Sequence, residues 1–347
     1  MVRQRNSDYW RKRTLELEEI LNKKGEDFYR ELEKAYQEAI RETEKDILKL
    51  YSKLASVNEI SLSEAKKLLL NNELAEFKWD IEQYLKYAKE NELSGAWIKE
   101  LENASLKVRI SRLEAMKLTL RHHVEALMSK EYNEFPTVMG DIYTEGYYRT
   151  VHMIQTGLET GSSFALIDTN RVEKVLTSAW VGEKTFSERI WGEHRVQLIE
   201  DLYKSLTRSV MRGESPDRLI NEVTKKYNVA RGRAKTLVMT ESAYFGNLAQ
   251  HDCYKELDVE KYIIVATLDL KTSEICREMD GKVFNMSEHE VGVTAPIFHV
   301  NCRTVTCPYF EGNIKRRFAR GKDGKGYYID EYMTYKEWYK NMLKTNN

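Results

Sequence analysis

The chain has 347 residues, enough for two domains, and 41% of them are hydrophobic, enough to bury a core. Its 55 basic and 55 acidic residues balance, which excludes a global positive field for nucleic acid and leaves only local patches. We find no apolar run of the roughly 18 residues that a membrane span needs, and no secretory signal at the charged start. All four cysteines lie in the C-terminal third, which favours a reducing compartment over a disulfide scaffold.

The N-terminal part is expected to form long helices, because the first of only four prolines is Pro136. Between Ser7 and Ala55, apolar residues recur at steps of three and four and predict one helical stripe. Two interpretations of this stripe stay open: ordinary intramolecular core, or an exposed surface that docks on a partner. The stripe consists of Phe28, Leu32, Ala35, Tyr36, Ala39, Ile40, Ile47, Leu50, Tyr51 and Leu54.

Further helices are expected along most of the remaining chain. A serine before a run of helix formers indicates a start near Ser61, and a helical pattern covers 95–127. The pattern breaks at 135–140, around Pro136, which predicts a boundary or hinge. The turn residues at 213–216 are expected to end one helix and begin the next. Helices are then expected at 140–157, 168–179, 187–211, 217–226 and 230–257, with a turn at 227–229.

A small β unit is expected near the end of the chain. Residues 262–268 are β-branched, apolar and short, as in a buried strand. Asp280-Gly281 predicts a turn beside a second strand, and 302–306 predicts a third. The predicted fold class is therefore mainly α with a small C-terminal β unit (α+β): a long helical N-terminal layer, then a helical plus small-sheet module.

A series of uncommon residues surrounds these strands in a fixed order. Residues 268–276 read Leu-Asp-Leu-Lys-Thr-Ser-Glu-Ile-Cys, and 296–303 read Pro-Ile-Phe-His-Val-Asn-Cys-Arg. This order resembles the C-terminal module of the phage Mu F-like minor head (head morphogenesis) proteins. The resemblance rests on Asp269, Thr272, Cys276, Asp280, Gly281, Pro296, His299, Asn301, Cys302 and Arg303.

Residues upstream of this block fit the same family. Thr240-Glu241 and Asn247 match its helix, and 180–190 also fits, so the resemblance spans about 175–310. Residues 9–13 and 335–338 look like the longer members from phages of Gram-positive hosts. Where many members carry a Cys-x-x-Cys, the earlier position here is Ser273.

The resemblance implies three regions. Residues 1–135 would be a helical region for portal docking or oligomer contacts. Residues 136–310 would be the Mu F-like head morphogenesis module, and 311–347 a basic flexible loop and C-terminal helix.

The resemblance also implies a portal-associated minor capsid protein of the virion and not an enzyme. Its expected roles are procapsid assembly and DNA packaging or ejection, with the portal protein as partner. Scaffolding and major capsid proteins are further candidate partners, and no membrane is expected. The expected location is the capsid interior or portal vertex, with the host cytoplasm during assembly.

The alternative function is a DNA-associated enzyme or toxin-like effector, such as an ADP-ribosyltransferase or nuclease. For the first of these only a Glu-x-Glu at Glu288 and Glu290 points that way, and no Ser-Thr-Ser precedes it. No phosphate-binding glycine loop is present either.

Four residues could supply a structural zinc site, the one cofactor hypothesis for this chain. Cys276, His299, Cys302 and Cys307 would form a Cys₃His set of the kind that binds zinc tetrahedrally. The alternative is that the thiols are buried and only pack, while His299 and Arg303 hydrogen-bond the loop. The adjacent His122 and His123 would point about 100° apart on a helix and are not expected to share a metal.

Two basic stretches indicate non-specific contact with double-stranded DNA. The first, Lys225-Lys226 with Arg231, Arg233 and Lys235, flanks a helix-turn-helix-like element. The second is a glycine-containing loop that could contact phosphates without reading bases, or could simply be a solvated loop. Its cations are Lys315, Arg316, Arg317, Arg320, Lys322 and Lys325.

Overall fold

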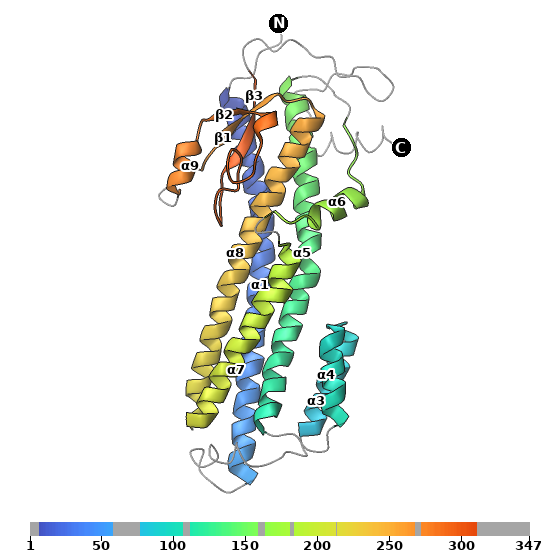
Figure 1. Ribbon diagram of the computed structural model, residues 1–347, viewed down its shortest axis with the longest axis vertical. Coiled ribbons are helices and arrows are strands. Elements are labelled where there is room, and N and C mark those ends of the chain that lie inside the picture. The colour runs from blue at the N-terminus through green and yellow to red at the C-terminus, as the bar shows by residue number, and fades with distance from the viewer. Residues whose placement is uncertain are drawn as a thin grey trace. The chain divides into compact units, whose positions relative to one another are not determined.

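The computed structural model describes residues 7–57, 77–106, 112–158, 164–180, 184–212, 214–267 and 272–310. It is mainly helical with one small antiparallel sheet, which confirms the predicted fold class (Figure 1). Contacts divide the chain into two compact units. The sheet unit comprises 1–28, 136–178 and 236–347, and the helical unit comprises 29–135 and 179–235.

The longest helices confirm the expectation from the scarcity of proline. Three of them, α1, α5 and α8, each contribute residues to both units. In the described part of the chain, no helix combines the length and apolar character required to cross a bilayer. The helices are α1 (Ser7–Val57), α3 (Phe77–Glu90), α4 (Gly95–Leu106), α5 (Arg112–Leu158), α6 (Thr169–Leu176), α7 (Arg195–Arg212), α8 (Pro216–Glu256) and α9 (Glu274–Met279), with a π-helix at Glu188–His194 and a 3₁₀ turn at Met286–Glu288.

The apolar stripe of α1 is intramolecular core. Six of its ten side chains are buried and Ala35 and Ile40 are half-buried, and two aromatic hydroxyls in this core are hydrogen-bonded. The Tyr36 hydroxyl donates to Glu131 at 3.2 Å, and the Tyr227 and Thr43 hydroxyls lie 3.2 Å apart. The docking interpretation is therefore wrong for the buried members, which are Phe28, Leu32, Tyr36, Ala39, Ile47 and Tyr51.

The first turns of α1 are anchored in the sheet unit by an aromatic side chain. Trp10 is buried, and its ring centroid lies 5.1 Å from that of Phe310, just after the last strand. The Trp10 ring also covers Gly157 near the end of α5, where an added Cβ would lie 2.2 Å from a ring carbon. The absence of a side chain at Gly157 therefore lets α1 and α5 approach closely.

The sheet has the order β2-β1-β3, with both neighbours antiparallel to β1 (Lys261–Val265). The partner strands are β2 (Val283–Asn285) and β3 (Val305–Tyr309). Tyr262 of β1 faces Pro308 of β3, and this proline is tolerated because β3 is an edge strand. All three predicted strands are present, but β3 starts three residues later than expected, because Cys302 to Thr304 follow the turn at 300–301 without pairing in the sheet.

Two predicted interruptions of helices are wrong. Helix α5 continues through Pro136, so the broken pattern at 135–140 does not end it, although the division between the two compact units falls between Phe135 and Pro136, as the predicted boundary does. Helix α8 likewise continues through 227–229, because Tyr227 is fully buried there and packing outweighs the weak helix propensity of the segment. Over Pro216–Glu256, which the structure describes as one helix, the predicted helix-turn-helix-like element does not form. The pattern over 95–127 is divided between α4 and α5, and the predicted start at Ser61 lies outside the described residues.

Glu131 should make the stability of the chain depend on pH. Burial raises the pKa of Glu131 to about 7, against the smaller opposing effect of the Tyr36 hydrogen bond. A raised pKa stabilises the folded state below about pH 4.5, and this stability is lost as the pH rises through 7. The glutamine of a Glu131→Gln variant does not ionise. The unfolding free energy of this variant relative to wild type should therefore be higher at pH 8 than at pH 5, by on the order of 3 kcal/mol.

Urea denaturation of wild type and variant at both pH values measures this difference. The exposed Glu38→Gln on α1 serves as the control, and its stability should follow that of the wild type. Parallel curves for Glu131→Gln and wild type would contradict the expectation.

Candidate functional site

Helix α8 presents a ladder of polar side chains to the segment that carries the motif. Thr240, Asn247 and Tyr254 are spaced by seven residues, so they lie along one face of the helix. The Thr240 hydroxyl accepts from the Asn301 amide at 2.9 Å. The Asn247 side chain donates to the Thr304 carbonyl at 3.3 Å, and the Tyr254 hydroxyl donates to that of Thr306 at 3.0 Å. The ladder thus fixes the backbone from 301 to 306 on α8.

A tight turn at the top of this ladder brings His299 and Cys302 together. The Cys302 amide donates to the His299 carbonyl at 3.2 Å, which closes the turn. Asn301 has a positive φ of 57°, a conformation that asparagine adopts more readily than most residues. The motif residue Asn301 is therefore required by the backbone of the turn.

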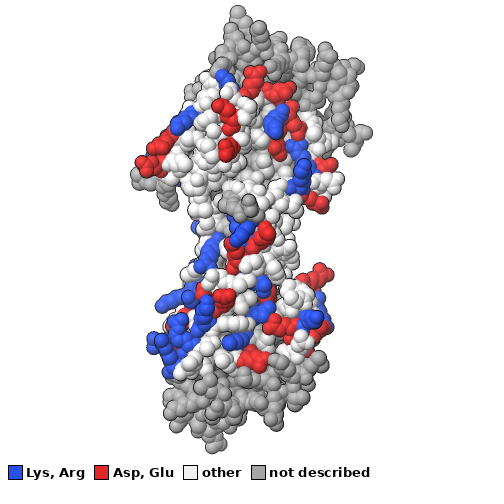
Figure 2. Space-filling model, viewed as in Figure 1, with Lys and Arg blue, Asp and Glu red and all other residues white. Residues whose placement is uncertain are grey.

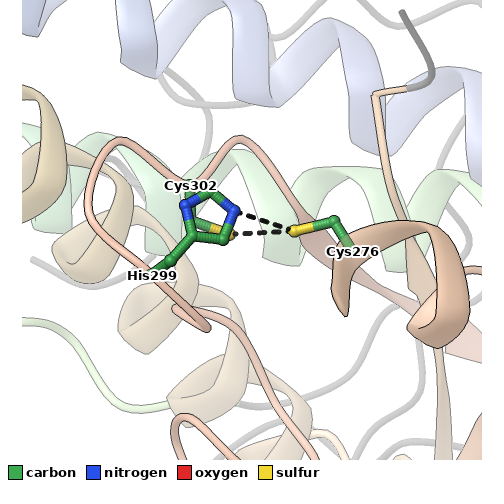
Figure 3. A group of neighbouring side chains, drawn as sticks. All are labelled: Cys276, His299 and Cys302. Atoms are coloured by element: carbon green, nitrogen blue, oxygen red, sulfur yellow. Dashed lines mark hydrogen bonds between the residues drawn. The ribbon is translucent and has the colours of Figure 1, made fainter. Parts of the chain in front are cut away.

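Cys276, on α9, faces this turn (Figure 3). Its Sγ lies 3.1 Å from His299 Nε2 and 3.7 Å from Cys302 Sγ. Both thiols are buried and the imidazole is half-buried. Their donor atoms all lie within 4.8 Å of one another, so three of the four predicted metal ligands come together.

The fourth predicted ligand, Cys307, is not part of this group. It lies on β3, where its Sγ contacts the Pro308 carbonyl at 3.7 Å. Burial raises the pKa of the Cys307 thiol to about 12, while Thr14 and Arg11 of α1 lower it. Burial also raises the pKa of Cys302, against backbone hydrogen bonds with Phe298 and Thr304 that lower it. The Cys₃His set is corrected to Cys276, His299 and Cys302.

The remaining described motif residues shape the loops around the sheet. The Asp280 carboxylate accepts from the Ala266 amide at 2.8 Å and pairs with Arg11 at 3.3 Å. Gly281 has a φ of 79°, and its amide donates to the Ile264 carbonyl at 2.9 Å. The Thr272 hydroxyl donates to the Thr267 carbonyl at 2.5 Å. These residues thus act through the backbone rather than as a reactive group.

The last motif residues lie beside the turn. Pro296 is buried in the loop that precedes His299, and the Arg303 carbonyl accepts from the Thr267 hydroxyl at 3.3 Å. The motif residue Asp269 and the basic residues from Lys315 to Lys325 lie outside the described residues.

A small cavity lies beside the ladder, between α1, α8 and residues 302–305. Burial raises the pKa of Glu18 in its wall to about 7, and the charge of Arg303 opposes that rise. Its volume of about 20 Å³ holds one water molecule and no larger ligand.

The remaining candidates for chemistry are engaged in local structure. Glu288 accepts hydrogen bonds from the backbone and side-chain nitrogens of Asn285, so the Glu-x-Glu contributes a cap. His122 stacks on Tyr84 with ring centroids 4.2 Å apart, while His123 contacts Asp46 at 2.9 Å. Burial lowers the pKa of His122 to about 3, which keeps this ring neutral.

Three of the five basic residues predicted around 227–229 are also in contact with other side chains. Lys226 pairs with Asp201, Arg231 pairs with Glu33, and Lys235 lies 5.2 Å from the centre of the Tyr29 ring.

Sequence reasoning missed a basic stripe on α7 of the helical unit. Lys204, Arg208 and Arg212 are exposed and four residues apart, so they share one helix face. Together with Tyr203, Thr207 and Met211 they line a shallow hollow, and Met211 is 73% exposed. Figure 2 shows Lys and Arg gathered at the lower left, over the region where Figure 1 places the end of α7 and the start of α8. The four-residue spacing of these cations is the feature of the sequence from which the stripe could have been predicted.

Comparison with known proteins agrees with the motif. Residues 200–307 match the family described as phage Mu protein F like protein. The minor head protein GP7 of Bacillus phage SPP1 is 23% identical over 271 residues, which cover 74% of this chain and 84% of that protein. No solved structure matches the chain. These findings confirm the resemblance read from the motif, and neither description is that of an enzyme.

Asp280 should contribute measurably to the stability of the sheet unit. Asp280→Ala leaves the Ala266 amide at the end of β1 without its carboxylate acceptor, and such a loss costs about 1–3 kcal/mol. Arg11→Ala removes only the partly exposed ion pair and should cost about 0–1 kcal/mol. Thermal or urea denaturation of both variants tests this order. Equal losses would show that the ion pair, rather than the amide contact, carries the effect.

Proposed function

We propose that this chain, a Mu F-like phage head protein, acts as a minor capsid protein at the portal vertex. There it would bind the portal protein during procapsid assembly and contact the genome during packaging or ejection. The observation that carries the proposal is the ordered motif within 200–307, on a segment that matches the family and the SPP1 relative. The virion location, the portal contact and the genome contact are all parts of this proposal, and the family match supports the first of them.

The architecture supports a role in binding rather than catalysis. In the described part of the chain, the motif residues hold loops and a turn, and the Glu-x-Glu caps a 3₁₀ turn. The cavity beside the ladder admits a single water. A head protein requires only docking surfaces and local charge, and the exposed stripe on α7 supplies such charge.

Portal binding is tested with the full-length chain, because a cut at Phe135 would sever α5. We expect a tagged copy, co-expressed with the portal protein of the same phage, to co-elute with it from affinity and size-exclusion columns. The major capsid protein, co-expressed in the same way, controls for general association between head proteins. Elution of the chain alone in the presence of folded portal protein would rule out the proposed contact.

Contact with DNA should depend on the stripe Lys204, Arg208 and Arg212. Phosphate contacts release counterions, so the binding constant for duplex DNA should fall steeply between low and physiological salt. Replacing all three residues with glutamine should weaken binding and reduce the salt slope by about 3, at roughly 0.9 per contact. Fluorescence anisotropy with labelled duplexes of two unrelated sequences measures both effects.

The matched control replaces Lys34, Lys45 and Lys86 with glutamine, which removes the same charge from exposed positions of the helical unit. This control should bind DNA as the wild type does. An unchanged salt slope in the α7 variant, or no binding by the wild type at low salt, would exclude this stripe as the contact.

A further inference from the structure

We propose that Cys276, His299 and Cys302 bind one zinc ion. Two sulfurs bound to a tetrahedral zinc at about 2.3 Å lie about 3.8 Å apart, and a sulfur and a nitrogen about 3.5 Å apart. The observed separations are 3.7 Å between the two Sγ atoms and 3.1 Å between Cys276 Sγ and His299 Nε2. At these two contacts an ion requires an opening of only a few tenths of an ångström, and all three donor atoms lie within 4.8 Å of one another.

The imidazole is held in the form that a metal requires. His299 Nδ1 lies 2.8 Å from the Val300 carbonyl, which can only accept a hydrogen bond. Nδ1 therefore carries a proton, and Nε2 is the ring nitrogen that faces the Cys276 sulfur (Figure 3). A backbone carbonyl behind the distal ring nitrogen is the usual outer partner of a zinc-bound histidine. The site thus has an outer partner as well as donors.

The two segments that carry the donors, α9 and the turn of His299 and Cys302, are called the arms of the site. Both arms are fixed by contacts outside the site. Ser273 caps α9 by accepting from the Cys276 amide at 3.3 Å, which sets the position of the first thiol. The turn that carries His299 and Cys302 is closed by its own hydrogen bond and attached to α8 at Thr240. Two buried thiols and an oriented imidazole are soft donors of the kind that zinc prefers. Preorganised donors of this kind favour a bound ion over three independently packed side chains.

The fourth coordination position falls to a water molecule, because the described donors within reach are these three. Ser273 lies three residues before Cys276 at the start of α9, the spacing of a Cys-x-x-Cys pair. Ser273→Cys should therefore add a third thiolate and bind zinc more tightly. The ion would join α9 to the turn, and 22 residues lie between Cys276 and His299 along the chain. Its removal should lower the melting temperature of the chain.

The test is metal analysis of the full-length protein, purified without chelator and dialysed. We expect about one zinc per chain by mass spectrometry, lost after chelation and regained with zinc chloride, together with a reversible shift in melting temperature. Cobalt substitution should give sulfur-to-metal charge-transfer bands and visible bands of tetrahedral cobalt. Less than one zinc per chain in untreated protein, with no cobalt spectrum after reconstitution, would overturn the proposal.

Variants identify the ligands. Cys276→Ser and Cys302→Ser should lose the zinc on dialysis, and the half-buried His299→Gln does the same with both thiols left in place. Cys307→Ser and Cys253→Ser are the matched controls, since each changes a buried cysteine outside the group and should retain the metal. Retention by folded His299→Gln, or loss from Cys307→Ser with native circular dichroism, would contradict this ligand set. If the two thiol variants fail to fold, His299→Gln and the cobalt spectrum of Ser273→Cys decide.

Discussion

The conformation of the motif segment depends on the polar ladder of α8. Thr240, Asn247 and Tyr254 bind backbone groups of Asn301, Thr304 and Thr306 in succession. Much of the surrounding structure is buried, and an unpaired buried backbone group costs about 1–3 kcal/mol. Three such groups on one helix therefore determine where the turn and β3 lie. The position of β1 follows, because β3 pairs with it along five residues.

Local chemistry explains what could be predicted from the sequence. The stripe of α1 follows from helical periodicity, and the strands follow from short β-branched apolar runs and the Asp280-Gly281 turn. Asp168 and Ser215 mark helix starts by capping. Prediction failed where packing outweighs propensity. Pro136 lies within α5, and α8 passes through Tyr227 because this side chain is buried and its hydroxyl contacts Thr43. Cysteine spacing could name candidate ligands but could not separate Cys302 from Cys307, which the turn and β3 place apart.

The charge distribution also shows where prediction from the sequence fails. Net charge is zero over the whole chain, so composition indicates no partner. The cations around Lys226 and Arg231 drew attention because they are close in sequence, yet both are paired with carboxylates of the helical unit. The stripe on α7 is less conspicuous, because Glu200, Asp201 and Glu214 lie among or beside its members. Lys204 lies 3.2 Å from Glu200 and Arg212 lies 3.8 Å from Glu214, so the stripe is distinguished by its helical period and its exposure and not by unpaired charge.

The polar ladder of α8 also determines how much a bound metal ion would contribute to folding. In small zinc domains the ion supplies the folding free energy, because no preformed site exists without it. Here the arms are positioned by protein contacts: Ser273 on Cys276, and Thr240 on the turn of Cys302. Because β1 and α8 already support both arms, an ion adds a cross-link to a folded segment instead of creating one. The module can therefore stay folded in metal-free form, and the thiols and imidazole then contact one another at 3.1 and 3.7 Å.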